Sequence, residues 1–214
     1  MSRIIDKGLE AELVLLAKMG EYTYETLSIS IHGYLEDKSV QNEVKEMSDM
    51  LVAMANEVED QTFQLIARYQ PVASDLRAIK SYMKIGNDFA RYGRYALDIS
   101  TINDQLKGFN QCQRWMRDDI HEMSDKVLFM VRSSIDALKR HDISLAKAIT
   151  KIEREVDAMY LNYINRLSKT EITDANCLLS SALVTRYLER IADHAVYVCE
   201  SVIYIATGEK LALS

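Results

Sequence analysis

Residues 188–198 have the sequence Leu-Glu-Arg-Ile-Ala-Asp-His-Ala-Val-Tyr-Val, and residues 89–99 have the sequence Phe-Ala-Arg-Tyr-Gly-Arg-Tyr-Ala-Leu-Asp-Ile. In both stretches apolar or small residues recur every three or four positions, the spacing of one face of an α-helix. A shift of 99 residues also aligns Arg91 with Arg190 and Gly93 with Ala192. The chain therefore contains two related long helices, and the sequence predicts an internal duplication.

The same periodicity extends outward from these two stretches. A shift of 98 aligns Glu57-Val-Glu59 with Glu155-Val-Asp157, so the duplicated unit includes the preceding helix as well. Six helices are predicted. The first four run from about Leu9 to Leu35, Val44 to Gln70, Pro71 to Ile102 and Trp115 to Leu138. The fifth begins after Asp142 and runs to about Tyr163, and the sixth begins after Thr173 or Asp174 and ends at Gly208. The predicted fold is all-α, two tandem antiparallel three-helix bundles covering residues 1–107 and 108–214.

Individual residues define several of these boundaries. Pro71 cannot continue a preceding helix but suits the first turn of a new one, so a helix is expected to start there. Asp142 is predicted to be an N-cap, and Gly208 is predicted to end the last helix in the left-handed conformation.

Composition excludes several classes of protein. The chain has 7 Gly and 1 Pro among 214 residues, too few for the turns of an all-β or α/β fold. Its net charge of −6 is the wrong sign for neutralising the phosphates of a nucleic acid. No apolar run is long enough to span a bilayer, and residues 1–12 do not have the order of a signal peptide, so a cytoplasmic protein is expected.

The three cysteines, Cys112, Cys177 and Cys199, have no CxxC spacing and are expected to lie inside helical patterns. Buried free thiols in a reducing compartment are expected from this arrangement. The four histidines show no paired metal-ligand spacing. No activated nucleophile or phosphate-binding glycine loop is present, so an enzyme is not expected.

Two pairs of acids four residues apart are the candidate metal ligands. Glu153 and Asp157 share one helix face, as do Glu189 and Asp193. If the fifth and sixth helices pack side by side, four carboxylates converge into a site for a hard cation. Each of Asp157, Glu189 and Asp193 also has an arginine three residues earlier, so the spacing alone favours local ion pairs over a metal site.

The stretch Arg186-Tyr-Leu-Glu-Arg-Ile-Ala-Asp-His-Ala-Val196, with the segment from Glu200 to Glu209, closely resembles the C-terminal signature of the PhoU family. Residues 70–77, Gln-Pro-Val-Ala-Ser-Asp-Leu-Arg, resemble the segment that opens that family's third helix. The resemblance implies a regulator of phosphate uptake and of the phosphate-starvation response. Its implied partners are the ATPase subunit of the phosphate transporter, at the cytoplasmic face of the membrane, or a sensor kinase, or both. A homodimer that reaches the membrane only through its partner is expected.

The family also carries a repeated E(D)xxxD motif that holds multinuclear iron or zinc clusters. The resemblance therefore favours iron or zinc in the second half, on Glu153, Asp157, Glu189 and Asp193. In the first half Ala55, Glu59, Ala90 and Arg94 occupy the equivalent positions, so metal binding is expected to be asymmetric. Arg94 is expected to form an ion pair with Glu59.

Two alternatives remain open. A ferritin-like di-iron carboxylate protein would also be helical and acidic, but it requires paired Glu-x-x-His motifs that this sequence lacks. A helical scaffold with no role in phosphate regulation would account for the composition alone.

Overall fold

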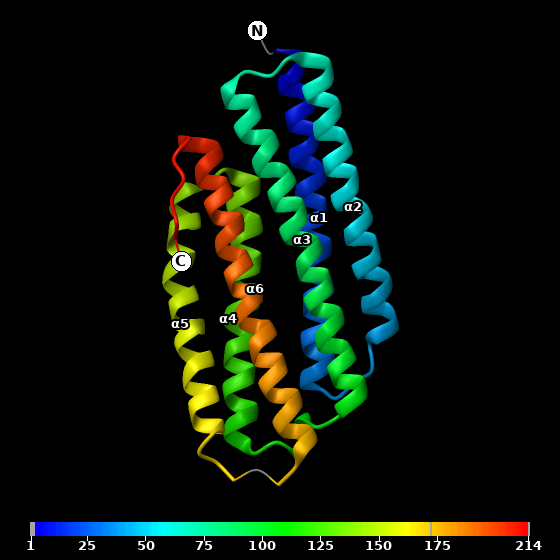
Figure 1. The fold of residues 1–214 in the computed structure, drawn as a ribbon, viewed down its shortest axis with the longest axis vertical. Helices are drawn as coiled ribbons and strands as arrows, with labels where there is room; N and C mark the ends of the chain where they lie inside the picture. The colour runs from blue at the N-terminus through cyan, green and yellow to red at the C-terminus, as the bar shows by residue number, and fades with distance from the viewer. Residues whose placement is uncertain (1–2, 172, 214) are drawn as a thin grey trace.

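The computed structural model describes residues 3–171 and 173–213, and within these ranges the regular structure is entirely helical. The helices are α1 (Ile4–Leu35), α2 (Gln41–Tyr69), α3 (Ala73–Leu106), the short 3₁₀ turn η1 (Phe109–Gln111), α4 (Arg114–Arg140), α5 (Ile143–Leu167) and α6 (Ala175–Thr207). Figure 1 shows α1, α2 and α3 as one antiparallel bundle beside a second bundle of α4, α5 and α6. The predicted all-α fold of two tandem three-helix bundles is confirmed.

The helix ends follow local chemistry. The carboxylates of Asp142 and Asp174 cap α5 and α6 by accepting hydrogen bonds from the backbone N–H groups of Leu145 and Cys177, at 2.9 and 2.7 Å. Gly208 ends α6 with φ = 77°, in the left-handed conformation that glycine adopts without a steric penalty. These predicted boundaries are confirmed.

The start of α3 was predicted wrongly by two residues. Gln70 adopts a left-handed conformation after α2, and α3 begins at Ala73, so Pro71 lies before the helix and not in its first turn. The reason is that the Asp75 carboxylate accepts a hydrogen bond of 3.0 Å from the N–H of Val72. This interaction makes Val72 the N-terminal cap residue of α3.

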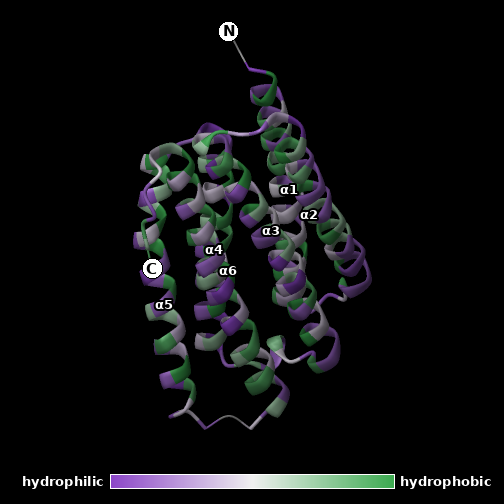
Figure 2. Cartoon of the chain, turned by 45° about the horizontal axis from the view of Figure 1, so that its top comes forward, coloured by the Kyte–Doolittle hydropathy of each residue, from purple (hydrophilic) through white to green (hydrophobic). Residues whose placement is uncertain are grey.

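The two bundles share one continuous core. Helix α3 packs against α6, and α1 packs against α4. The α1–α4 contact is close, because a side-chain carbon at Gly20 would lie only 3.1 Å from Ile135. Figure 2 shows apolar and polar residues alternating along the helices, as expected of amphipathic helices. The inward-facing residues of both bundles form a single cluster of buried side chains.

The expectation of three free thiols is wrong. Cys112 and Cys177 form a disulfide, and only Cys199 is a free, buried thiol in the described chain. The segment after α3 lies directly on the first turn of α6, where a side-chain carbon at Gly108 would approach the Cys177 nitrogen to 2.6 Å. This approach places the two cysteine Cα atoms 5.3 Å apart, within the range that a disulfide spans. These two cysteines therefore give no support to a reducing compartment.

None of the helices within the described ranges combines the length and the apolar composition needed to cross a bilayer.

Candidate metal centre

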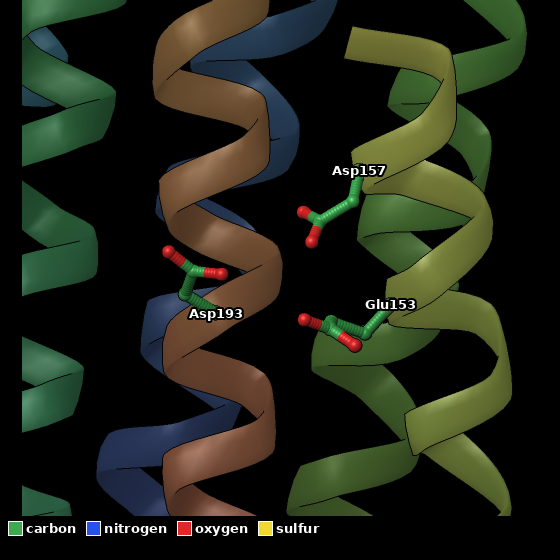
Figure 3. A group of neighbouring side chains, drawn as sticks. All are labelled: Glu153, Asp157 and Asp193. Atoms are coloured by element: carbon green, nitrogen blue, oxygen red, sulfur yellow. The ribbon is translucent and has the colours of Figure 1, made fainter. Parts of the chain in front are cut away.

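Helices α5 and α6 bring the predicted acidic residues to one place. Glu153 and Asp157 lie one turn apart on α5, and Asp193 lies on the neighbouring, antiparallel α6. Figure 3 shows these three carboxylates pointing toward one another across the gap between the two helices. Glu153 and Asp157, four residues apart on α5, therefore both face α6, as the sequence predicted.

Three carboxylates form a group with the dimensions of a cation site. Glu153, Asp157 and Asp193 each offer an oxygen atom, and these oxygens all lie within 4.8 Å of one another. Glu153 is 3% exposed, and the other two side chains are half-buried. Glu153 Oε2 and Asp157 Oδ1 are buried, and no described residue donates a hydrogen bond to either. Unpartnered carboxylate oxygens are what a bound cation would satisfy, so these residues fit a metal.

The electrostatics of the group show what the cation would relieve. Burial raises the pKa of Glu153 to about 7, with further increases from the charges of Asp157 and Asp193. Burial also raises the pKa of Asp193, followed by the effect of Asp157. Below about pH 7 the Glu153 carboxyl therefore holds a proton when no cation is present. Cation binding would release that proton.

Glu189 lies outside the three-carboxylate group. Its Oε1 forms an ion pair of 2.5 Å with Nη1 of Arg186, which also contacts the ring face of Tyr160. Glu189 Oε2 is buried and has no hydrogen-bond partner among the described residues. Burial, and then the charge of Asp193, raise its pKa. Glu189 is thus near the group but already paired.

Local ion pairing accounts for only part of the acidic cluster. Of the three arginine–acid pairs that the spacing allows, the pair between Arg186 and Glu189 forms, whereas no ion pair joins Arg154 to Asp157 or Arg190 to Asp193 in the described structure. Arg190 instead lies over the ring of Tyr95, at 5.2 Å. Asp157 and Asp193 are thus left without a neutralising arginine contact.

In the first bundle the equivalent positions are chemically different. Ala90 is buried, while Glu59 and Arg94 are exposed. The expectation of an ion pair between Glu59 and Arg94 is wrong. Among the described residues, the charged groups of these two side chains do not approach within 4 Å of each other. An ion pair between two solvated side chains contributes at most about 1 kcal/mol, so their opposite charges alone do not require the contact. No group of three potential metal ligands is found in the described part of this bundle.

A buried polar contact between the bundles was not predicted from the sequence. His194 Nδ1 lies 2.8 Å from Asp88 Oδ1, and His194 Nε2 lies 3.2 Å from the hydroxyl of Tyr95. All three residues are at most 8% exposed. Tyr95 and His194 occupy equivalent positions of the two repeats under the 99-residue shift, so this contact joins matching residues of α3 and α6. The repeat was therefore the signal that could have found this pair.

The chain matches known proteins over most of its length. A family model described as "PhoU domain" matches residues 16–102 and 120–202. A "Phosphate-specific transport system accessory protein PhoU homolog" from Clostridium acetobutylicum is 31% identical, over 96% of this chain and 94% of that protein. The "Phosphate-specific transport system accessory protein PhoU homolog 1" of Thermotoga maritima is 30% identical, over 94% of this chain and 90% of that protein. The crystal structure of PhoU from Pseudomonas aeruginosa is 26% identical and covers 95% of this chain and 99% of its own, with a TM-score of 0.88.

Proposed function

Because the chain belongs to the PhoU family, whose domain is repeated in its two bundles, we propose that it is an accessory protein that regulates phosphate transport. The observation that carries this proposal is the match to phosphate-specific transport accessory proteins, which extends over nearly the full length of this chain and of each matched protein. The test is deletion of the gene in its native host, with phosphate uptake measured at high and low phosphate. Uptake that is no longer restrained at high phosphate is expected, and unchanged uptake under both conditions would contradict the proposal.

The protein is proposed to act by binding partners in the cytoplasm, without turnover of its own. The proposed partners are the ATPase subunit of the phosphate transporter and a sensor kinase, contacted through helical faces at the membrane surface. A pull-down with each candidate at high and low phosphate tests this part separately. A homodimer is also proposed, and light scattering of the purified chain measures its mass.

Metal binding by the second bundle is the second part of the proposal. Glu153, Asp157 and Asp193 would hold the cation, with Glu189 as a fourth carboxylate once it leaves Arg186. Iron and zinc are the metals that the family resemblance suggests. The three assembled ligands are all oxygens, a donor set that suits hard cations such as Mg²⁺ and Mn²⁺ better than zinc, which is most often held by sulfur and nitrogen.

We expect an Asp157→Asn, Asp193→Asn double variant to lose most of its bound metal, because two of the three converging charges are gone. Metal content is measured on tag-free protein after incubation with Mn²⁺, Fe²⁺ or Zn²⁺ and removal of the free ion. The matched control is Glu59→Gln in the first bundle, which should leave the metal content unchanged. If the control loses metal, or if the double variant retains it, the proposed assignment of the site to the second bundle is wrong.

A ferritin-like di-iron protein is the competing function, and the ligand set argues against it. The three assembled ligands are carboxylates, and the only histidine beside them in sequence, His194, contacts Asp88 and Tyr95 instead. A di-iron site would require histidines within the ligand group. Measurable ferroxidase activity of the iron-loaded chain would favour the competing function.

A further inference from the structure

A small cavity lies between α3, the C-terminal part of α6 and the segment that follows α6. Its volume is about 190 Å³, and seven of the eight residues that line it are polar or charged: Lys80, Ser81, Lys84, Glu200, Ser201, Tyr204 and Lys210, with Leu211 the eighth. The cavity is separate from the carboxylate group: on α6 its lining begins at Glu200, about two turns beyond Asp193. It belongs to the contact between the two bundles, because α3 and α6 come from different repeats.

The charge of the cavity is opposite to that of the whole protein. Three lysines and one glutamate line it, whereas the chain carries a net charge of −6. The glutamate, Glu200, is already engaged: Lys84 Nζ lies 3.7 Å from one of its oxygens, and the N–H of Leu213 donates a hydrogen bond of 3.0 Å to the other. Lys80 and Lys210 have no carboxylate within 4 Å in the described structure. Two ammonium groups are therefore left for an anion.

Further cationic and hydroxyl groups lie next to these lysines. Arg77 precedes Ser81 by one turn and Lys84 by two, so the three share a face of α3. The guanidinium of Arg77 lies beside Gly208, where a side-chain carbon would be 3.4 Å from its Cζ. Arg77 Nε is buried, and no described residue accepts a hydrogen bond from it. The hydroxyls of Ser81 and Tyr204 add neutral donors to the cavity wall.

We propose that this cavity binds a tetrahedral oxyanion, and specifically inorganic phosphate. Lys80 and Lys210 supply charge-assisted hydrogen bonds, Lys84 adds a third ammonium group that the anion would share with Glu200, and the cavity is small for a nucleotide. The bound anion would lie between the two repeats and against the C-terminal segment, so its binding would stabilise their contact. The regulatory meaning of the site rests on the proposed function, but binding of phosphate can be tested without it.

The test is titration of the purified full-length chain in phosphate-free buffer, by calorimetry and by ³¹P NMR. Saturable binding of inorganic phosphate is expected. A Lys80→Met, Lys84→Met variant should bind about tenfold more weakly or worse, because charge-assisted hydrogen bonds are lost. Glu200→Gln should bind phosphate more tightly than the parent, since the carboxylate that competes for Lys84 is removed while an acceptor for Leu213 remains. Circular dichroism checks that each variant is folded.

The control is Lys147→Met, Lys151→Met, which removes the same charge from exposed positions on α5. It should change the affinity less than about twofold, because solvated, distant charges are screened. Equal weakening by both lysine pairs, or the absence of saturable binding to the parent chain, would overturn the site. If glycerol 3-phosphate binds more tightly than inorganic phosphate, the assignment of free inorganic phosphate as the ligand is wrong. Neither result bears on the deletion experiment, so the regulatory function stands or falls separately.

Discussion

At the scale of single residues, Glu12 is a carboxylic acid buried in the first bundle. Its side chain is 1% exposed, and its Oε2 is buried without a hydrogen-bond donor among the described residues. Burial raises its pKa to about 7, with a smaller increase from the charge of Glu57. The folded state therefore prefers protonated Glu12. Its contribution to stability is complete below the pKa of the unfolded chain, about 4.5, and is lost as the pH rises through 7.

Glu12→Gln removes this dependence on pH, because the amide does not ionise. We expect its free energy of unfolding, relative to the parent, to increase by about 2–3 kcal/mol between pH 5 and pH 8. Any constant cost of burying the amide cancels in this comparison. Urea unfolding at the two pH values measures it. The exposed neighbour Glu10 is the control, and Glu10→Gln should show no such change. An equal effect of Glu12→Gln at both pH values would mean that Glu12 is ionised throughout.

At the scale of elements, the start of α6 joins the two bundles. Asp174 caps this helix, Cys177 in its first turn is linked to Cys112, and Gly108 allows the connecting segment to lie against the same turn. A cap satisfies backbone N–H groups that have no partner within the helix, and its carboxylate interacts favourably with the helix dipole. The first turn of α6 therefore depends on local capping as well as on tertiary contact.

Asp174→Ala should lower the free energy of unfolding by about 1 kcal/mol, because the N–H of Cys177 loses its acceptor. Asp174→Asn keeps a side-chain oxygen and should recover most of that loss. Urea unfolding at neutral pH under non-reducing conditions measures both variants with the disulfide intact. Equal losses in the two variants would show that the capping hydrogen bond is not the cause.

At the scale of the whole molecule, the continuous core argues that the repeats unfold together. Gly20 of α1 lies against Ile135 of α4, and Tyr34 of α1 packs on Phe109 with ring centroids 5.0 Å apart. Contacts of this kind make the stability of one bundle depend on the other. We therefore propose that the boundary between residues 107 and 108 separates the two sequence repeats, but that the two repeats do not fold independently.

Leu51→Ala tests this coupling. Leu51 is fully buried in the first bundle, and its truncation should cost about 2–5 kcal/mol. Trp115, the single tryptophan, lies in the second bundle beside Tyr163 and reports that bundle by fluorescence. The fluorescence midpoint in urea should fall together with the midpoint from circular dichroism. Val14→Ala, at an exposed position of the same bundle, is the control and should leave both midpoints unchanged. A Trp115 midpoint that does not move in Leu51→Ala would show two independent units.

The sequence by itself determined the helices, their caps and the duplication, because periodicity, N-capping by Asp142 and the left-handed Gly208 depend on residues within about a turn of one another. The spacing also predicted that Glu153, Asp157, Glu189 and Asp193 converge, and three of these four carboxylates lie together, since a pair four residues apart on each helix limits where the carboxylates can point. That they bind a metal stays a prediction.

Only the tertiary structure decided which distant side chains meet. The disulfide between Cys112 and Cys177 and the contact of His194 with Asp88 both depend on how the helices are rotated and offset against one another. The packing of the complete core sets those rotations and offsets, because many side chains across both bundles must fit simultaneously. Spacing within one helix carries no information about that fit.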